Sequence, residues 1–229
     1  MTRIKICGLT SDEDIRLCVE AGTQMLGFVV EYPVDVPWNI GRLTAQALMC
    51  GVPPFVSRVI VVGHDPETVI GLVELLKPNA VQLHGSEPLS VTANIVAAVK
   101  ALGVQVIKAL RFSIETGKCC SACENPLDAA KLIEDTGVDA LLLDSVSDTW
   151  PAGTGQSIDW SIARKIRESV QLPVILAGGL NSRNVGQAIA AVNPYGVDVI
   201  SGVENSMGKK DPEKVRAFIE AVTGSDPKP

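Results

Sequence analysis

Eight short apolar segments recur along the chain, and segments with helix-start signals lie between them. The apolar segments are rich in β-branched and aliphatic residues, as strands that are covered on both faces should be. A regular alternation of such strands with helices is typical of α/β proteins. The predicted strands are Arg3–Cys7, Met25–Val30, Arg58–Val62, Ala80–Leu83, Val104–Lys108, Ala140–Leu143, Val174–Leu176 and Val197–Ser201.

Capping residues and prolines mark where the helices should begin. Ser11 precedes three acidic residues, which is the pattern of an N-cap followed by a negatively charged first turn. Asp65 precedes Pro66, and proline is favoured at the first helical position, so His64 is expected to lie just before a helix cap. Further helices are expected to begin near Glu87-Pro88, Asn125-Pro126, Asp159, Asn181-Ser182 and Asp211-Pro212.

A weak internal repeat lies where each helix should end. Glycine there ends a helix in the left-handed conformation, before the next strand. The repeated segments are Gly22-Thr23-Gln24, Gly103-Val104-Gln105, Gly137-Val138-Asp139 and Gly196-Val197-Asp198, and Pro78-Asn79-Ala80 occupies the equivalent place in another unit.

The number of units predicts the architecture. Eight units in 229 residues average about 29 residues, which suits a strand, a helix and two short loops. We therefore predict an α/β fold, a single-domain (β/α)8 TIM barrel over residues 1–229; an open doubly wound sheet is the alternative. Residues 116–125 are expected to form an irregular insertion, and residues 224–229 a flexible tail.

Composition excludes several functional classes. Hydrophobic residues make up 46% of the chain and aromatic residues only 4%, so an aliphatic core is expected and intrinsic disorder is excluded. A net charge of −6 without a basic patch argues against a nucleic-acid partner. An anionic ligand must therefore be held by local groups.

Cysteine spacing and hydropathy indicate the compartment. Six cysteines, at positions 7, 18, 50, 119, 120 and 123, are too scattered for a disulfide framework in a chain of this length. The first residues lack the apolar region of a signal peptide, and no apolar run approaches the roughly 20 residues of a membrane span. We expect a protein of the reducing cytoplasm with no membrane association.

Four features should meet at one rim of the predicted barrel, because active sites of this fold lie at the carboxyl ends of the strands. Cys7 ends the first strand and Asp144 the sixth; Gly178-Gly179 follow the seventh, and Ser201-Gly202 end the eighth. Glycines there let backbone N–H groups approach an anion, and Ser201 could begin a short helix that faces it. The pattern predicts a phosphate site, and the alternative is a pair of ordinary glycine turns.

Cys7 and Asp144 each allow two interpretations. Cys7 is either a small apolar core residue or a reactive thiol, and strand alternation places Lys5 on the same face, where its charge would favour the thiolate. Lys5 is otherwise a buried lysine paired with a carboxylate. Asp144 is either a loop cap or a catalytic acid. A thiolate and a carboxylic acid on opposite sides of one mouth suit paired proton transfers.

The remaining metal and substrate candidates are weaker. The segment from Cys119 to Cys123 contains a C-x-x-C pattern, but no second cluster supplies further ligands, so we expect no metal site and no redox role. His84, in Gln82-Leu83-His84-Gly85, ends the fourth strand and is expected to lie beside a substrate.

Together these residues resemble the phosphoribosylanthranilate isomerase family of tryptophan biosynthesis, over almost the whole chain and in order. The resemblance rests on Lys5-Ile6-Cys7-Gly8-Leu9-Thr10, Gln82-Leu83-His84-Gly85, Ile107-Lys108-Ala109-Leu110, Leu141-Leu142-Leu143-Asp144-Ser145, Gly153-Thr154-Gly155, Ala177-Gly178-Gly179-Leu180, Ser201-Gly202-Val203-Glu204 and Gly208-Lys209-Lys210-Asp211.

The resemblance implies an Amadori rearrangement of N-(5′-phosphoribosyl)anthranilate that needs no cofactor. It implies that Asp144 is the general acid that opens the ribose ring and that Cys7 is the general base that removes the C2′ proton. The phosphate would rest on Gly178, Gly179, Ser201 and Gly202. The implied partner is a phosphorylated small molecule, and the implied assembly is a monomer or a homodimer.

One departure from the family pattern concerns the aglycone. The family usually carries Ser-Pro-Arg after the second strand, with the arginine near the anthranilate carboxylate, whereas this chain reads Val36-Pro37-Trp38. Trp38 can stack on an aromatic ring but cannot form a bidentate pair with a carboxylate. Arg42 is a candidate substitute, and Ile200 replaces a common serine. The substrate-binding candidates are therefore Lys5, Trp38, Arg42 and His84.

Two other functions remain open from the sequence. One is a paralogous isomerase acting on another phosphorylated N-glycoside that lacks the carboxylate. The other is a non-catalytic phosphate-binding barrel, which the retention of both Cys7 and Asp144 disfavours because a binding protein needs neither.

Overall fold

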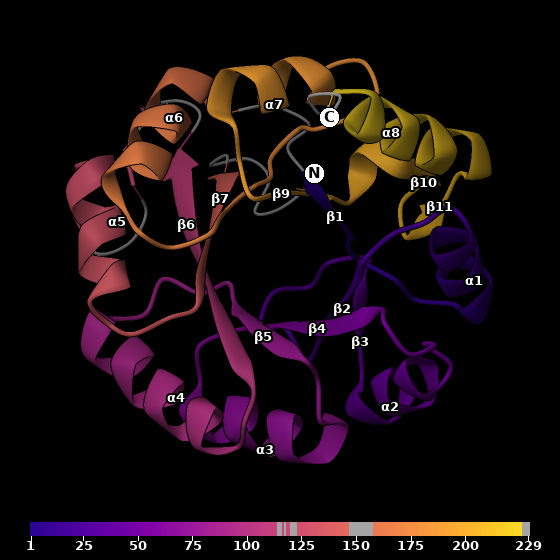
Figure 1. The fold of residues 1–229 in the computed structure, drawn as a ribbon. Coiled ribbons are helices and arrows are strands. Elements are labelled where there is room, and N and C mark those ends of the chain that lie inside the picture. Colours follow the sequence, from indigo (N-terminus) through magenta and orange to yellow (C-terminus); the bar gives the residue numbers. More distant parts are fainter. Residues whose placement is uncertain (114–115, 117, 120–122, 147–157, 226–229) are drawn as a thin grey trace.

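Eight parallel strands close into a barrel in the computed structural model, which describes residues 1–113, 116, 118–119, 123–146 and 158–225. Closure follows because β1 pairs with both β2 and β9, which confirms the predicted TIM barrel and not the open sheet (Figure 1). The barrel strands are β1 (Arg3–Ile6), β2 (Met25–Val30), β4 (Ser57–Val62), β5 (Ala80–Leu83), β6 (Gln105–Ser113), β7 (Ala140–Val146), β8 (Val174–Leu176) and β9 (Gly196–Val199).

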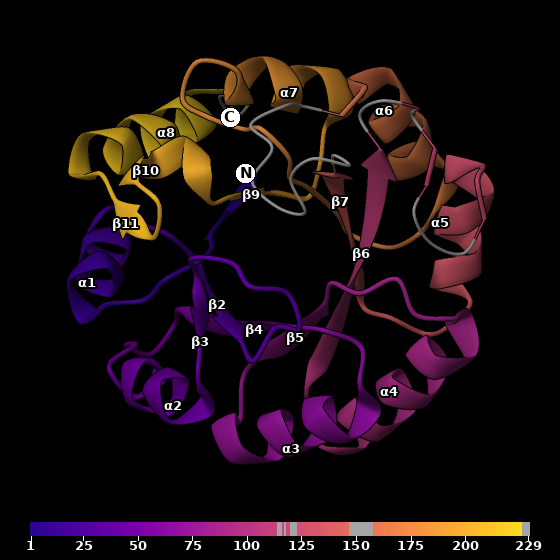
Figure 2. The same ribbon diagram turned by 180° about the vertical axis from the view of Figure 1, so that it is seen from behind.

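Helices form a ring around the strands, as both views show (Figures 1 and 2). They are α1 (Asp12–Glu20), α2 (Arg42–Cys50), α3 (Pro66–Leu76), α4 (Leu89–Ala101), α5 (Pro126–Glu134), α6 (Trp160–Ser169), α7 (Val185–Val192) and α8 (Pro212–Ser225). Among the described residues, no helix is both long and apolar enough to cross a membrane.

Several of the predicted helix starts are explained by side-chain caps. Ser11 Oγ accepts a hydrogen bond from the Asp14 N–H, Asp65 caps α3 through Thr68, and Asn125 caps α5. The start of α7 differs from the prediction. Residues 181–184 form a turn first, and α7 begins at Val185.

Short elements border the barrel mouth. The sequence did not predict β3 (Asn39–Ile40), which pairs with β2, or the hairpin of β10 (Glu204–Ser206) and β11 (Lys209–Lys210). A 3-10 helix, η1 (Ser201–Val203), forms where the sequence suggests a short helix beginning at Ser201. The prediction that the last strand continues to Ser201 is wrong. At Ile200 the backbone leaves the extended conformation, with φ −119° and ψ −82°, so β9 ends at Val199 and Ser201 opens η1.

The barrel interior is filled by aliphatic side chains, as the low aromatic content predicts. Ile107 and Ala109 on β6, and Ala140 and Leu142 on β7, belong to this inner cluster. Because alternate residues of a strand point to the same face, the next inward positions toward the carboxyl ends are Arg111 and Asp144. A separate, larger apolar core lies between the strands and the surrounding helices.

Two expected irregular segments are described only in part. Helix α8 continues through Ser225, so Gly224 and Ser225 are helical, and residues 226–229 lie outside the described residues. In the segment 116–125, Cys119 forms an isolated antiparallel bridge with Phe112. The Gly153-Thr154-Gly155 motif also falls outside the described residues.

Candidate active site

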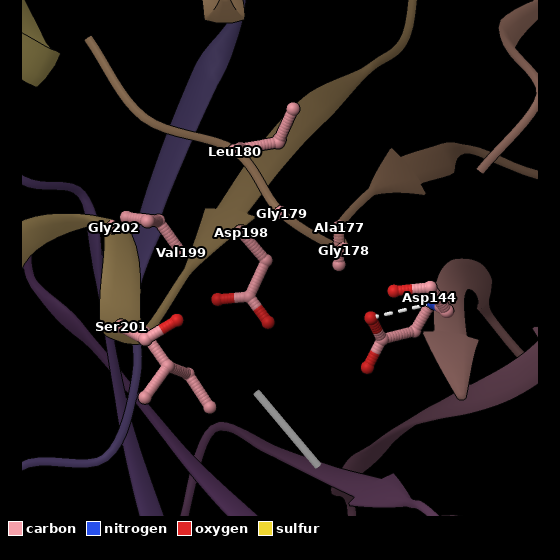
Figure 3. A pocket seen from close by; sticks show the side chains of 11 residues that line it. Asp144, Ala177, Gly178, Gly179, Leu180, Asp198, Val199, Ser201 and Gly202 are labelled. Carbon is pink, nitrogen blue, oxygen red and sulfur yellow. Dashed lines mark hydrogen bonds between the residues drawn. The ribbon is translucent and has the colours of Figure 1, made fainter. Parts of the chain in front are cut away.

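A pocket lies at the carboxyl ends of β7, β8 and β9 and is lined by residues 144–145, 177–180 and 198–202. The structure therefore brings Asp144 together with Gly178, Gly179, Ser201 and Gly202, as the barrel prediction requires. In Figure 3, the Asp144 and Asp198 carboxylates reach into the same space from neighbouring parts of the wall. The pocket combines acidic side chains with glycine-rich backbone.

The glycines of this pocket are required by close contacts. A Cβ on Gly202 would lie 1.9 Å from the Leu180 carbonyl oxygen, so the loops after β8 and β9 can meet only if residue 202 lacks a side chain. Gly178 has φ +80°, and a Cβ there would lie 2.8 Å from Ser145 Oγ. The backbone around residues 178–179 is thereby held open to the pocket, where an anion can reach the peptide N–H groups.

Two asparagines hold the first glycine loop in place. Asn184 Nδ2 donates to the Gly179 carbonyl oxygen at 2.9 Å, and Asn181 Nδ2 donates to the same oxygen at 3.3 Å. The Asn181 N–H in turn donates to Asn184 Oδ1 at 2.8 Å. These hydrogen bonds hold the loop in one conformation next to the pocket.

Cys7 is buried at the end of β1, and the groups around it shift the pKa of its thiol in opposite directions. Gly27 on β2 makes room for the thiol, since a Cβ there would lie 2.5 Å from Cys7 Sγ. Burial raises the pKa of the Cys7 thiol above its ordinary value of 9.0; the Lys5 ammonium offsets part of this increase, and Asp198 adds to it. Free Cys7 is therefore a thiol at neutral pH, with a cation beside it that favours the thiolate.

Lys5 combines both of the roles considered for it. Lys5 Nζ lies 2.8 Å from Asp198 Oδ2, and both side chains are buried. Burial lowers the pKa of Lys5, but Asp198 and Cys7 together outweigh burial, so the pKa is raised above 10.5 and the lysine stays charged. It is a buried, paired lysine that also acts on the Cys7 thiol.

Asp198 is a site residue that sequence reasoning missed. The sequence places it in the Gly196-Val197-Asp198 repeat and in the last predicted strand but assigns it no role; in the structure it lies within β9, directly opposite Lys5 in the register. Its Oδ1 is buried, has no hydrogen-bond partner among the described residues, and belongs to a side chain that lines the pocket. Strand alternation after Gly196 was the available signal, since it places residue 198 on the inner face.

Asp144 lies at the barrel mouth, and a backbone hydrogen bond holds one of its two carboxylate oxygens. Its Oδ1 accepts a hydrogen bond from the Ser145 N–H at 2.8 Å, and its Oδ2 lies 3.6 Å from His84 Nε2. Burial raises the pKa of Asp144 to about 6; the Ser145 N–H, Arg111 and Lys5 limit the increase, and Asp198 adds to it. The Asp144 carboxyl can therefore hold or release a proton near neutral pH.

His84 is neutral in this setting. Burial and the nearby cations Arg111, Lys108 and Lys5 lower its pKa to about 3. Gln82 Nε2 lies 3.2 Å from His84 Nδ1, and a hydrogen bond there leaves the ring proton on Nε2, which faces Asp144. The Tyr32 hydroxyl donates to the His84 carbonyl oxygen at 3.0 Å. His84 thus offers a neutral donor at the mouth, where the sequence predicts it.

Trp38 belongs to an apolar wall together with Cys7, Val29 and Val61. Its indole Nε1 donates to Glu204 Oε1 at 2.7 Å, and Lys210 Nζ lies 2.8 Å from the same oxygen. An indole has a single N–H donor, so Trp38 has none left for a ligand. The Trp38 side chain is buried, and its ring packs closely against Gly8, where a Cβ would lie 2.7 Å from the ring.

Arg42 lies at the first turn of α2 and is half-exposed. Its Nε donates to Glu31 Oε1 at 2.7 Å, and its second terminal nitrogen lies 2.6 Å from Glu31 Oε2. This is the bidentate geometry in which a guanidinium and a carboxylate satisfy each other. The structure thus gives the Arg42 side chain a protein carboxylate as its partner.

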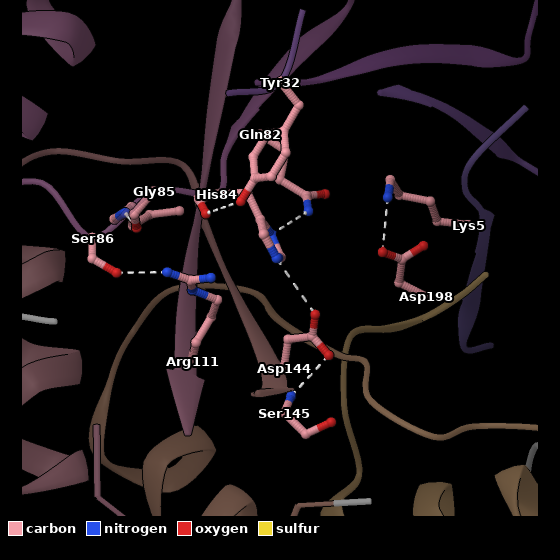
Figure 4. A network of polar contacts seen from close by, with 11 residues as sticks. Lys5, Tyr32, Gln82, His84, Gly85, Ser86, Arg111, Asp144, Ser145 and Asp198 are labelled. Atoms are coloured by element: carbon pink, nitrogen blue, oxygen red, sulfur yellow. Dashed lines mark hydrogen bonds and ion pairs between the residues drawn. The ribbon is translucent and has the colours of Figure 1, made fainter. Parts of the chain in front are cut away.

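Arg111 and Ser86 are further residues that sequence reasoning missed. In Figure 4, the Arg111 side chain extends from β6 toward Ser86, and the His84 ring lies between Tyr32 and Asp144. The Arg111 guanidinium donates to Ser86 Oγ, and Arg111 pairs directly with Asp144 in the β6–β7 register. The Lys5–Asp198 pair is on the opposite side of that view.

The cysteine-rich segment is described only in part. Among the described residues, no group of three or more His, Cys, Asp or Glu side chains is placed to hold a metal ion. The Cys123 thiol donates to the Asn125 carbonyl oxygen at 3.4 Å, and Cys120 lies outside the described residues. His64 is exposed just before the Asp65 cap of α3, as predicted.

Comparison with known proteins places the chain among relatives of one kind. The family model described as N-(5′phosphoribosyl)anthranilate (PRA) isomerase matches residues 4–221. A protein of Natronomonas pharaonis named N-(5′-phosphoribosyl)anthranilate isomerase is 39% identical and covers 98% of this chain and 99% of its own length. A Methanocella arvoryzae protein of the same name is 42% identical, with 97% of this chain and 98% of the relative covered.

Solved structures agree in fold over the whole chain. Phosphoribosyl anthranilate isomerase from Thermotoga maritima matches with a TM-score of 0.80 and 35% identity, covering 98% of this chain and 100% of that one. A structure of such an isomerase in complex with reduced 1-(o-carboxyphenylamino)-1-deoxyribulose 5-phosphate matches with a TM-score of 0.77 and 35% identity, over the same shares of the two chains.

Proposed function

This chain belongs to the N-(5′-phosphoribosyl)anthranilate isomerase family, and we propose that Cys7 and Asp144 are the general base and the general acid of its reaction. The enzyme is an isomerase of tryptophan biosynthesis that converts N-(5′-phosphoribosyl)anthranilate to 1-(2-carboxyphenylamino)-1-deoxyribulose 5-phosphate. The observation that carries the proposal is that Asp144 lines the glycine-rich pocket, while Cys7 lies beside Lys5, whose partner Asp198 lines the same pocket.

Ring opening is the first step, and Asp144 supplies its proton. Protonation of the ribose ring oxygen lets the bond from C1′ to that oxygen break, while the anilino nitrogen lone pair forms an iminium. A carboxyl whose pKa is about 6 keeps a substantial protonated fraction near neutral pH, as a general acid requires. Once it is ionised, the Ser145 N–H stabilises the carboxylate through Oδ1.

Proton removal from C2′ is the second step, and the Cys7 thiolate performs it. The iminium acidifies the C2′ proton because it accepts the electron pair of the C–H bond and becomes an enolamine. The enolamine then tautomerises to the ketone. Lys5 favours the thiolate by its charge, and Asp198 holds Lys5 in place at 2.8 Å.

Asp198 and the glycine loops bind the sugar phosphate in this proposal. The free Oδ1 of Asp198 accepts a hydrogen bond from a ribose hydroxyl, which satisfies a buried oxygen that is otherwise unpaired. The phosphate lies against Gly178, Gly179, Ser201 and Gly202, and the asparagine-held loop meets it already in shape. His84 and the Trp38 ring border the aglycone.

Turnover of N-(5′-phosphoribosyl)anthranilate by the purified protein tests this function. We expect consumption of the substrate without any added cofactor, and growth of a tryptophan-requiring strain that lacks the isomerase when this chain is expressed. Absence of both would overturn the assignment. Turnover of a phosphorylated N-glycoside without the carboxylate would then support the paralogous isomerase.

We also propose that the enzyme works as a homodimer in the cytoplasm. Phe55 is fully exposed, with φ +71°, and it borders a hollow of about 320 Å³ that is lined at the amino ends of the strands by Arg3, Asn79 and Tyr195, among others. A twofold dimer brings the same patch of both protomers together, so the protruding aromatic of each protomer can enter the hollow of the other. The Thermotoga maritima enzyme is described as dimeric. Light scattering of wild type and Phe55→Asp tests this: a dimer that the substitution dissociates is expected, and a monomeric wild type would contradict it.

A further inference from the structure

The anthranilate carboxylate of the proposed substrate needs a cation, and the two residues first considered for that role are committed elsewhere. Trp38 has no charge and uses its one donor on Glu204. The Arg42 guanidinium is paired with both oxygens of Glu31. The inference below rests on the proposed function and concerns which residue takes the carboxylate.

Most cations near the mouth already have a carboxylate partner. Lys5 pairs with Asp198, and Lys210 pairs with Glu204. Lys108 lies 2.9 Å from Glu87 and also donates to the Gly85 carbonyl oxygen. Among the described residues, no carboxylate forms an ion pair with Arg111, whose guanidinium has only the Ser86 hydroxyl as a partner.

Arg111 lies on the inner face of the barrel at the mouth. Its position follows from the alternation that puts Ile107 and Ala109 in the interior cluster. It is half-buried, and its charge contributes to the lowered pKa of His84 and limits the raised pKa of Asp144. The Arg111 guanidinium is therefore close enough to His84 and Asp144 to influence their protonation.

The phosphate pocket and Arg111 lie on different sides of the barrel mouth. The pocket is formed by the ends of β7, β8 and β9, whereas Arg111 and Ser86 belong to β6 and the loop after β5. In Figure 4, Asp144 and His84 lie between the Lys5–Asp198 pair and the Arg111–Ser86 pair. A substrate whose phosphate lies in the pocket and whose ribose lies between Cys7 and Asp144 extends its other end away from the pocket.

Apolar residues border this second side. Val29, Val61 and Trp38 form the wall next to Cys7, and Tyr32 packs against it. Tyr32 is also in edge contact with the His84 ring, with the two centroids 6.2 Å apart. An aromatic ring held against this wall can direct an ortho carboxylate toward the guanidinium.

We propose that Arg111 binds the anthranilate carboxylate, in place of the arginine that position 38 lacks. The Ser86 hydroxyl occupies one of the five N–H donors of the guanidinium, and the others are free for the bidentate geometry that carboxylates favour. Ser86 acts as a positioning residue, because it fixes the guanidinium without touching the substrate.

Two inhibitors that differ only in the carboxylate test the proposal. The first is the reduced product, 1-(2-carboxyphenylamino)-1-deoxyribitol 5-phosphate, and the second is its phenylamino counterpart. Titration calorimetry should give tighter binding of the first by wild type. Arg111→Met should weaken the first about 10- to 100-fold, as expected when a charge-assisted hydrogen bond is lost, and leave the second within about twofold. Arg111→Lys should recover part of the loss.

Retained binding of the phenylamino inhibitor also shows that the Arg111 variant is folded. Arg164→Met, which removes a surface arginine paired with Glu168 on α6, serves as the control and should bind both inhibitors like wild type. Equal weakening of both inhibitors by Arg111→Met, or no weakening of either, would overturn the proposal. A selective loss in Arg42→Met and none in Arg111→Met would overturn it in favour of Arg42.

Turnover measurements distinguish a failure of the Arg111 assignment from a failure of the isomerase function. If wild type converts N-(5′-phosphoribosyl)anthranilate and Arg111→Met has an unchanged KM, the role of Arg111 is wrong and the isomerase assignment stands. If wild type neither converts the substrate nor binds the carboxylate inhibitor, both are wrong.

Discussion

Lys5 Nζ lies 2.8 Å from Asp198 Oδ2 inside the barrel, and the two residues face each other across neighbouring strands β1 and β9. The pair keeps a cation buried beside the Cys7 thiol, where an unpaired lysine would lose its proton. The closure of the barrel between its first and last strands therefore also holds the cation that favours the Cys7 thiolate, the proposed base.

The pH dependence of kcat/KM should be bell-shaped. Asp144, with a pKa of about 6, must be protonated, and Cys7, with a pKa raised above 9.0, must be ionised. Below pH 6 the thiolate fraction falls as pH falls, whereas above the thiol pKa the carboxylic acid fraction falls as pH rises. Between the two pKa values, a rise in pH increases the thiolate fraction as much as it decreases the carboxylic acid fraction, so a plateau is expected. Initial rates from pH 5 to about pH 10 test this, and a profile that stays flat through pH 6 would contradict the role of Asp144.

Asp144→Asn should stabilise the protein while removing activity. Folding raises the pKa of Asp144 from 3.8 to about 6. Relative to high pH, the carboxyl therefore stabilises the folded state in full below pH 3.8, and this stabilisation is lost as pH rises through 6. At pH 8 the amide should therefore raise the free energy of unfolding by up to about 3 kcal/mol, the equivalent of about two pKa units.

Urea unfolding of wild type and Asp144→Asn at pH 8 and pH 4 measures this difference. The gain should nearly vanish at pH 4, where the folded wild type already carries a proton on Asp144. A gain of equal size at both pH values would show that the carboxylate charge is not its cause.

Gly202→Ala should damage phosphate binding. A Cβ at residue 202 would lie 1.9 Å from the Leu180 carbonyl oxygen, so the loop after β8 must move away from the loop after β9. We expect KM for the phosphorylated substrate to rise at least about tenfold, equivalent to about 1.4 kcal/mol. Gly71→Ala is the matched control, because a Cβ in the middle of α3 meets nothing within 4 Å and should stabilise the helix by about 0.5–1 kcal/mol. An unchanged KM in Gly202→Ala would contradict the site.

Trp38→Phe tests whether Trp38 is held by its indole N–H. The substitution removes the 2.7 Å hydrogen bond to Glu204 while keeping an aromatic ring, and a bond to a charged group is worth about 1.5–3 kcal/mol. Trp160→Phe is the comparison, because the buried Trp160 Nε1 has no partner among the described residues and its removal should cost little stability. Equal destabilisation by the two substitutions, measured by chemical unfolding, would argue against the Glu204 contact.

The sequence predicted the barrel and much of its rim because these depend on local patterns. Strands covered on both faces are continuous apolar runs, so the edges of β2, β5 and β8 were read correctly from composition alone. Cys7 and the glycines of residues 178–179 were found because they interrupt those runs at the carboxyl ends.

The residues that were missed depend on contacts between distant segments. Asp198 meets Lys5, which is 193 positions away, and Trp38 meets Glu204, which is 166 positions away. Such pairs follow from the register of a closed barrel and not from spacing. Arg111 directly follows the Ile107-Lys108-Ala109-Leu110 motif, and the sequence gives it no visible role, because only the folded chain shows that Arg42 is paired with a carboxylate and that, among the described residues, Arg111 is not.

The activity of Cys7→Ala compared with that of Cys18→Ala is the sharpest measurement of whether Cys7 is the general base. Both cysteines are buried, and burial raises the pKa of each, but Cys18 lies within α1 away from the pocket. With N-(5′-phosphoribosyl)anthranilate as substrate, Cys7→Ala should lower kcat by about 10²- to 10⁴-fold, and Cys18→Ala should change it only a few-fold. A Cys7→Ala enzyme with a kcat within a few-fold of wild type would contradict the assignment of Cys7 as the base.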